Sequence, residues 1–286
     1  MATFTVPADF LAGPGPEVNV TRVDFAQTQC PEFAGSYAVV LDNVLSPDEC
    51  TQLVNFAEQS SGGEPGNGKW ERAMVNIGGG KQKIYTDIRN CDRIIWDDPV
   101  LVDRIWQRCR PHVPEVEKLK DNKSVMGLRP VQRGESYVMT RLNERMRFLK
   151  YAGGEYFNGK RAHPVWILIL TERLNLHHVG ANALVVPTVH CDGMYITPDN
   201  SECSFYTLHL YLNQRDADND LVGGATSFHG QDMEREYNVF PKTGRVLLFQ
   251  HRGLWHSGQQ VEAGVKYTLR TDLMFKRDDQ ESEGRN

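Results

Sequence analysis

The sequence lacks several features that mark particular classes of protein. Its six cysteines are scattered without a CxxC pair, which disfavours a zinc ribbon or a dense disulfide framework and favours a reducing compartment. The net charge of -5 gives no case for nucleic-acid binding. No run approaches the roughly 18 apolar residues of a membrane span, and the N-terminus has no basic-then-apolar signal peptide. We expect a soluble, non-secreted protein of the cytoplasm or nucleus that binds neither nucleic acid nor membrane.

The chain divides by composition into three parts. Residues 1–34 are rich in Pro and Gly and predict an N-terminal arm laid on the domain. Residues 35–280 fit one large domain, and the charged residues 281–286 predict a disordered tail.

Two helices are expected in the first half of the domain. Ser46-Pro47-Asp48-Glu49 is a capping box with Pro at the first helical position. A second helix is expected from Pro99, with an apolar face that runs from Leu101 to Cys109, and Pro111 ends it. A strand is expected at 37–41, and another at 70–77 between two glycine-rich loops.

Beyond residue 136 the apolar pattern changes to a period of two. This predicts strands at 145–151, 204–213, 225–229, 245–250 and 265–275. Helices first and many short strands later favour an α+β, mainly β fold, with supporting N-terminal helices on an antiparallel sandwich or jelly roll.

His190-Cys191-Asp192 is a His-x-Asp motif, whose spacing lets two side chains on one side of an extended segment reach one ion. His256 follows a strand much later and supplies a third candidate ligand. Two imidazoles and a carboxylate on one face of an octahedral Fe(II) leave the opposite positions open, which indicates catalysis. His209, His229 and His251 are interpreted as packed histidines.

These motifs resemble the Fe(II)/2-oxoglutarate-dependent oxygenases of the prolyl 4-hydroxylase type. The resemblance runs from about Leu41 to Phe275 and includes the strand and turn RMRFLKYAGGEYF, the His-x-Asp, the Gly223-Gly224 turn and the distal His256. It implies a double-stranded β-helix, the jelly-roll or cupin-like core, with iron on His190, Asp192 and His256. It also implies 2-oxoglutarate and O2 as co-substrates, with ascorbate as a further cofactor to test, and hydroxylation of an unactivated C–H bond with release of succinate and CO2.

The resemblance also proposes the residues that bind 2-oxoglutarate. Lys266, ten residues after His256, occupies the position of the family's co-substrate cation. Arg270 shares a strand face with it, and its fork also suits a carboxylate, so both stay open. Tyr211 and Tyr151 resemble hydroxyls of the same pocket. A core tyrosine with a satisfied hydroxyl is an equal alternative for Tyr151, whereas the pocket role is preferred for Tyr211.

Residues 158–189 form an atypical insertion, because in the resembling family the His-x-Asp follows the preceding turn almost at once. One interpretation is a lid or a dimerisation element. A second hypothesis is translated intron retained by an incorrect gene model, which transcript sequencing across the segment tests.

The substrate is left open between a peptidyl and a small-molecule compound, since fold and iron site do not determine it. A non-catalytic metal-binding relative is the alternative from another class, and the oligomeric state is not predicted. Residues ahead of the β-rich half are candidates for substrate loops, or equally for a solvated charged loop: Trp70, Asn76, Tyr85, Arg89, Asn90 and Arg93.

Overall fold

The computed structural model describes residues 4–76, 81–157, 189–216 and 220–278. Apart from Val189, the predicted insertion at 158–189 therefore lies outside the described residues, as does the predicted tail at 281–286.

Two longer helices and two short ones support a β-rich fold. The helices are α1 (Pro47–Ser60), α2 (Pro99–Cys109), α3 (Lys123–Met126) and α4 (Leu128–Gln132), with 3-10 turns at Phe25–Gln27, Pro31–Phe33, Arg110–His112 and Pro114–Val116. The early strands are β1 (Asn19–Arg22), β2 (Ala38–Asp42), β3 (Glu71–Arg72), β4 (Val75–Asn76), β5 (Gln82–Lys83), β6 (Asp92–Asp97), β7 (Lys118–Lys120), β8 (Ser136–Leu142) and β9 (Arg145–Ala152). The later strands are β10 (Cys203–Tyr211), β11 (Val222–Gly223), β12 (Thr226–His229), β13 (Glu236–Val239), β14 (Val246–Gln250), β15 (His256–Gly258), β16 (Val261–Ala263) and β17 (Val265–Arg277).

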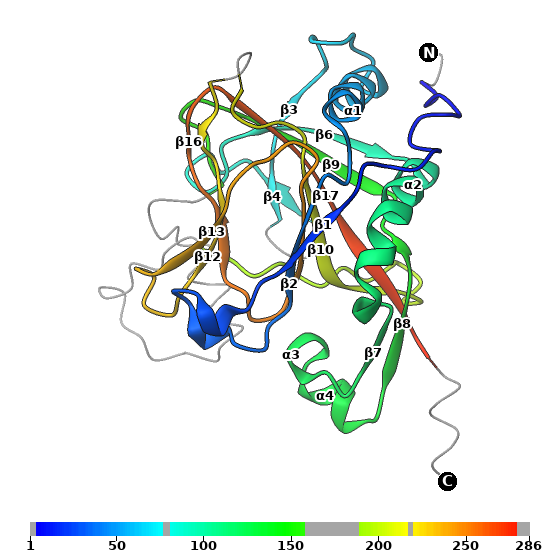
Figure 1. The fold of residues 1–286 in the computed structure, drawn as a ribbon, viewed down its shortest axis with the longest axis vertical. Coiled ribbons are helices and arrows are strands. Elements are labelled where there is room, and N and C mark those ends of the chain that lie inside the picture. The colour runs from blue at the N-terminus through cyan, green and yellow to red at the C-terminus, as the bar shows by residue number, and fades with distance from the viewer. Residues whose placement is uncertain (1–3, 77–80, 158–188, 217–219, 279–286) are drawn as a thin grey trace.

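The strands form a double-stranded β-helix, as the sequence predicted. The large antiparallel sheet has the order β1-β2-β14-β10-β17-β9-β6-β3, and β8 adds to β17. Opposite it lies a smaller sheet, β13-β12-β15, which a backbone bridge between His190 and His256 extends to the next segment. Figure 1 shows β12 and β13 on one side of the molecule and β10, β17 and α2 on the other.

Side chains on the large sheet alternate between two environments, because successive residues of a strand point to opposite faces. One face belongs to a core that includes α1 and α2, and its strand residues include Phe148, Leu208, Leu210, Leu269 and Leu273. The other face looks toward the small sheet and carries Val40, Tyr211, Leu247 and Phe249.

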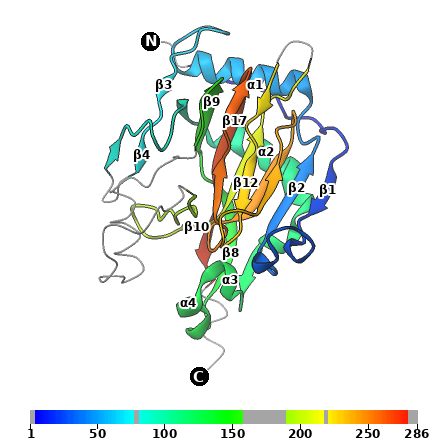
Figure 2. The same ribbon diagram turned by 90° about the vertical axis from the view of Figure 1, so that its left-hand side faces the viewer.

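The helices cover the outer face of the large sheet. Ser46 caps α1 through a reciprocal pair of bonds with Glu49, so the predicted capping box is confirmed. Asp98 caps α2 by accepting from the backbone amides of Val100 and Leu101, and the predicted apolar face of α2 is buried. Figure 2 shows α1 lying across the end of the sheet that contains β9 and β17.

The chain before the domain contributes to the sheet. Within the predicted arm 1–34, β1 pairs with β2 and becomes an edge strand. Phe10, Phe25 and Phe33 are buried. The single strand expected at 70–77 is in fact two short strands, β3 and β4, which join different sheets. The domain limits stay a prediction.

None of the helices within the described ranges is long and apolar enough to cross a bilayer.

Phe148 is the packing centre beneath the strands that bear the polar inner face, with Ile94 and Leu269 as its cross-strand neighbours. Its side chain is 0% exposed, whereas that of Phe240 is 57% exposed. We expect Phe148→Ala to lower the free energy of unfolding by about 3–5 kcal/mol, and Phe240→Ala by about 1 kcal/mol or less. Urea unfolding measures both, and similar losses for the two variants would contradict this packing.

Candidate metal centre

The candidate metal ligands come from two chain segments that hold each other through the backbone. The amide of His190 donates to the carbonyl of His256 at 3.0 Å, and the amide of His256 donates back at 2.9 Å. The two imidazole rings consequently lie side by side, with centroids 4.4 Å apart. Asp192, two residues beyond His190, reaches the same point, as the His-x-Asp spacing predicted.

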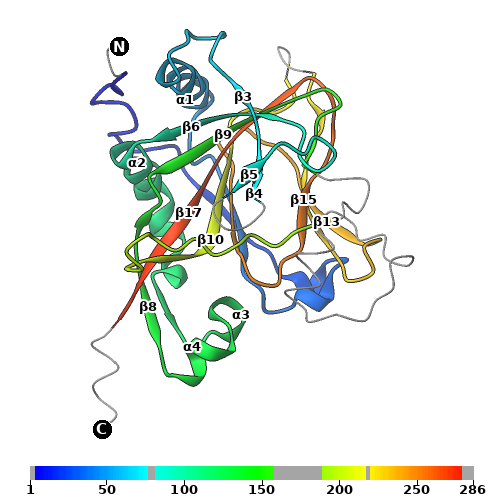
Figure 3. The same cartoon turned by 180° about the vertical axis from the view of Figure 1, so that it is seen from behind.

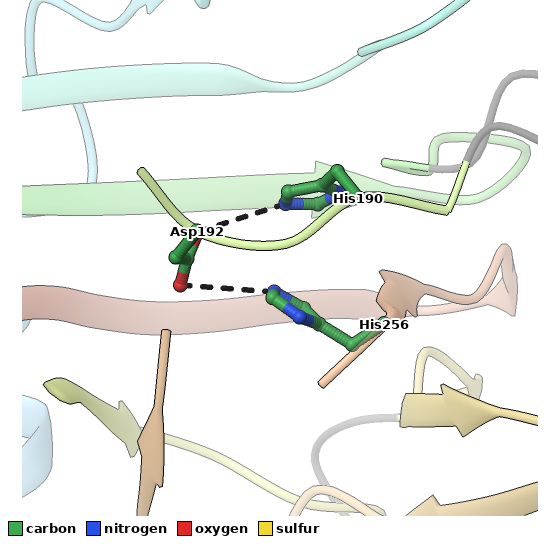
Figure 4. Close-up of side chains that lie close together, drawn as sticks. All are labelled: His190, Asp192 and His256. Atoms are coloured by element: carbon green, nitrogen blue, oxygen red, sulfur yellow. Dashed lines mark ion pairs between the residues drawn. The ribbon is translucent and has the colours of Figure 1, made fainter. Parts of the chain in front are cut away.

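The three side chains converge in a geometry that suits a metal ion. Their ligand atoms all lie within 4.8 Å of one another. Nε2 of His190 is 3.7 Å from Oδ1 of Asp192, and Nε2 of His256 is 3.7 Å from Oδ2 (Figure 4).

The protonation of the histidines also fits metal binding. Nδ1 of His256 lies 3.0 Å from the carbonyl of Leu254; donating to it leaves the Nε2 lone pair facing Asp192. Burial lowers the pKa of both His190 and His256, so the imidazoles are neutral, the form that coordinates a metal. Two neutral imidazoles and one carboxylate match the facial triad of non-haem Fe(II).

Asp192 is a buried carboxylate that two further side chains hold in place. Nη2 of Arg270 lies 2.8 Å from Oδ1, and the Thr207 hydroxyl donates to Oδ2 at 2.5 Å. Burial alone would raise the pKa of Asp192, but Arg270, His256 and His190 together hold it far below its ordinary value. The ligand is therefore ionised before any metal binds.

A cavity of about 40 Å³ adjoins the three ligands. Its walls come from the inner face of the large sheet and from the small sheet. Besides the ligands, the lining residues are Arg89, Leu149, Tyr151, Phe157, Thr207, His209, Thr226, Phe249, Ser257, Gly258, Lys266 and Arg270.

Lys266 is a buried ammonium group at one end of this cavity. Its side chain is 2% exposed, and Nζ donates to the carbonyl of Gly224 at 2.5 Å. Nζ also lies over the rings of Tyr151 and Tyr211, 5.2 and 5.6 Å from their centroids. Burial lowers the pKa of Lys266 to about 7. No carboxylate lies within salt-bridge distance of it among the described residues.

The two predicted tyrosines differ in their relation to the cavity. Tyr151 lines it directly. Tyr211 lies behind the wall, where its hydroxyl donates at 2.7 Å to Thr226, a lining residue. In this position Tyr211 orients the hydroxyl that the cavity presents.

Lys266 and Arg270 lie at different ends of the site. They lie four residues apart on β17, which is about 13 Å of extended strand. Lys266 is paired in register with Tyr151, whereas Arg270 is paired with Arg147 and contacts Asp192. Figure 3 shows β17 running along most of the molecule, so one strand supplies both ends.

Three residues near the site were not among the predicted site residues: Thr207, Phe157 and Arg147. Thr207 and Arg147 lie on strands, at alternate positions whose side chains point to the inner face. The sequence shows this alternation, but the strand register is needed to tell which set of positions faces inward. Phe157 packs on His190 with ring centroids 4.4 Å apart. His209 lines the cavity, whereas His229 bonds to Ser257 and His251 lies 3.6 Å from Asp272.

Removal of one ligand is expected to abolish tight metal binding. His256→Ala should weaken Fe(II) binding by more than about 100-fold, beyond the range typical for loss of an outer-shell partner. His112→Ala, which removes a histidine from the turn Arg110–His112, is the control. Anaerobic Fe(II) titration gives both affinities, and equal affinities would exclude His256 as a ligand.

Comparison with known families agrees with this chemistry. Residues 175–271 match the family model described as the 2OG-Fe(II) oxygenase superfamily. This range contains His190, Asp192, His256 and Lys266. No curated protein sequence matches the chain.

Solved structures with a similar fold include three prolyl hydroxylases. The viral collagen prolyl hydroxylase of Paramecium Bursaria Chlorella virus-1, in its 2OG complex, is 17% identical over 85% of this chain and 97% of that one, with a TM-score of 0.44. A Pseudomonas putida prolyl-4-hydroxylase is 12% identical over 85% and 94%, with a TM-score of 0.45. The Trichoplax adhaerens prolyl hydroxylase, solved with a peptide fragment of the hypoxia inducible factor oxygen degradation domain, is 14% identical over 89% and 90%, with a TM-score of 0.46.

The matched family model and the His-Asp-His group indicate the same chemistry. Iron(II), 2-oxoglutarate and O2 are the cofactor and co-substrates that this family implies. The resemblance predicted from the sequence is confirmed as a resemblance: residues 175–271 are similar to the 2OG-Fe(II) oxygenase superfamily.

Proposed function

We propose that this protein is an Fe(II)- and 2-oxoglutarate-dependent dioxygenase that hydroxylates an unactivated C–H bond, as prolyl 4-hydroxylases do. The observation that carries the proposal is one cavity with the triad of His190, Asp192 and His256 at its wall and the buried ammonium of Lys266 at its end. A non-catalytic metal-binding domain would not need the buried ammonium of Lys266.

Different side chains of the cavity bind different parts of 2-oxoglutarate. Lys266 is a buried cation whose desolvation a carboxylate of the co-substrate offsets. Tyr151 and the Thr226 hydroxyl, oriented by Tyr211, complete that end of the cavity. The opposite end of the co-substrate then faces the triad.

The protein also controls what reaches the metal. Bound Fe(II) supplies dioxygen activation coupled to decarboxylation of 2-oxoglutarate to succinate and CO2, with ascorbate as a reductant that maintains the ferrous state. Leu149, Phe157 and Phe249 line the cavity with apolar surface and exclude water from it. Thr207 and Arg270 hold Asp192 in a single orientation toward the metal.

Turnover of 2-oxoglutarate tests the proposal without knowledge of the substrate. Anaerobically purified protein given Fe(II), ascorbate, 2-oxoglutarate and air should release succinate slowly, and His190→Ala should lose this release. Lys266→Met should raise the 2-oxoglutarate concentration for half-maximal release by at least about tenfold, since a hydrogen bond to a charged group is worth about 1.5–3 kcal/mol.

The control is Lys276→Met, which removes an exposed lysine from the same strand and should change neither quantity. Absence of both succinate release and 2-oxoglutarate binding in the wild-type protein would reject the proposed function.

Binding of 2-oxoglutarate should weaken as the pH rises. The carboxylate pairs with the protonated form of Lys266, whose pKa of about 7 means that this form predominates below pH 7 and is lost above it. The dissociation constant should therefore increase about tenfold from pH 6 to pH 8. Calorimetric titration of protein with Zn(II), a redox-inert substitute for iron, measures this dependence.

Lys266→Arg provides the matched control for the pH dependence, because a guanidinium stays charged throughout this range. Its affinity for 2-oxoglutarate should be nearly independent of pH. A pH dependence as steep as that of the wild type would show that another group titrates.

A further inference from the structure

Three arginines lie at or next to the cavity: Arg89 and Arg270 line it, and Arg147 lies beside Arg270. Arg147 of β9 and Arg270 of β17 are direct cross-strand neighbours. Arg89 lines the same cavity from the segment before β6. We call Arg89, Arg147 and Arg270 the arginine cluster. Burial lowers the pKa of Arg147, Asp272 raises it, and Arg270 and Arg89 lower it further, so the three arginine charges act on one another.

In the described part of the chain, two carboxylates, Asp272 and Asp192, lie within salt-bridge distance of the arginine cluster. Asp272 is shared, with Oδ2 3.4 Å from Nη1 of Arg147 and Oδ1 3.6 Å from Nη2 of Arg270. These contacts are long for charge-assisted hydrogen bonds, and Oδ1 of Asp272 has no hydrogen-bond partner among the described residues. The other contact of Arg270 is Asp192, whose charge the metal requires.

Burial lowers the pKa of Arg89, but Cys91 and Tyr151 beside its guanidinium raise it above its ordinary value, so its described neighbours are these two groups in place of a carboxylate. Its side chain is 8% exposed, yet no carboxylate lies within 4.0 Å of its guanidinium in the described part of the chain. The guanidinium lies over the Phe157 ring at 4.7 Å, and Phe157 in turn packs on His190. Its Nε has no hydrogen-bond partner in the described ranges, and neither has Nε of Arg270.

Such an arrangement is costly unless an anion completes it. Like charges directly opposite each other on paired strands are destabilising, and an unpaired buried cation costs several kcal/mol. The co-substrate does not balance the cluster. The charges of Fe(II) and Lys266 are matched by Asp192 and the two carboxylates of 2-oxoglutarate, which leaves Asp272 as the carboxylate for the three arginines among the residues that the structure describes.

We infer that the primary substrate carries a carboxylate, which the arginine cluster binds beside the iron site. This inference rests on the proposed function and specifies its substrate class. The carboxylate positions the rest of the substrate against the metal. Arg89 and Arg270, which line the cavity, hold it, and Arg147 adds its charge from beside Arg270. A substrate without an anionic group would leave this excess positive charge without a partner.

Matched carboxylate and amide probes test the inference. Protein saturated with Zn(II) and 2-oxoglutarate is titrated with N-acetyl-L-proline and with N-acetyl-L-prolinamide by calorimetry. The carboxylate should bind at least about tenfold more tightly than the amide, as expected for a charge-assisted contact. N-acetyl-L-glutamic acid α-amide, as a third probe, distinguishes a side-chain carboxylate from a terminal one by which of the two acids binds more tightly.

Two variants test whether the cluster is the source of this preference. Arg147→Gln should reduce the carboxylate preference to less than about threefold. Arg145→Gln is the matched control on the same strand; its guanidinium pairs with Asp97 at 2.8 Å on the surface, and the preference should persist. Urea unfolding checks that both variants fold.

The outcomes separate the inference from the proposed function. If 2-oxoglutarate binds the Zn(II) protein but the amide binds as tightly as the carboxylate, or neither probe binds, the inference is rejected and the proposed function is retained. If Arg147→Gln keeps the full preference, the cluster is not the site. If 2-oxoglutarate itself fails to bind the wild type, the proposed function fails.

Discussion

The alternation of side chains along β17 is the constraint on which the rest of this structure depends. Its odd-numbered residues, such as Leu269 and Leu273, enter the core beneath α1 and α2. Its even-numbered residues, Lys266 and Arg270, face the cavity. A shift of one residue in register would bury the charges among the leucines and remove the chemistry from the cavity. Stability and function are therefore set by the same pairings with β9 and β10.

The interior between the two sheets is unusually charged, and the charges are arranged in order along it. Lys266 occupies one end, the triad lies further along, and Arg270 of the arginine cluster contacts Asp192. Each buried charge costs desolvation free energy that the folded chain alone does not fully recover. The site is thus stabilised by what it binds, and the apolar outer core provides the stability that the inner face lacks.

The sequence was most informative where a local pattern determines the structure. Capping residues located α1 and α2, and the His-x-Asp spacing with His256 located the metal ligands. Whether Lys266 or Arg270 binds 2-oxoglutarate could not be decided from the sequence, because both share one strand face. The register with β9 determines how far along the cavity each residue lies. Thr207 and Arg147 were not predicted as site residues for a related reason. From the sequence alone, a polar residue in a strand is expected to face solvent, and only the position of the opposite sheet shows that it faces the cavity.

The mutual backbone bonds of His190 and His256 join two positions that are far apart in the chain. A metal bound by both residues and by Asp192 would act as a covalent cross-link does, closing the chain between them into a loop. Because the entropy of closure grows only with the logarithm of loop length, the chain between Asp192 and His256 tolerates insertion at small cost as long as this junction forms. The bound metal would then also stabilise the folded small sheet. The measured affinity for the metal would include the free energy of closing that sheet.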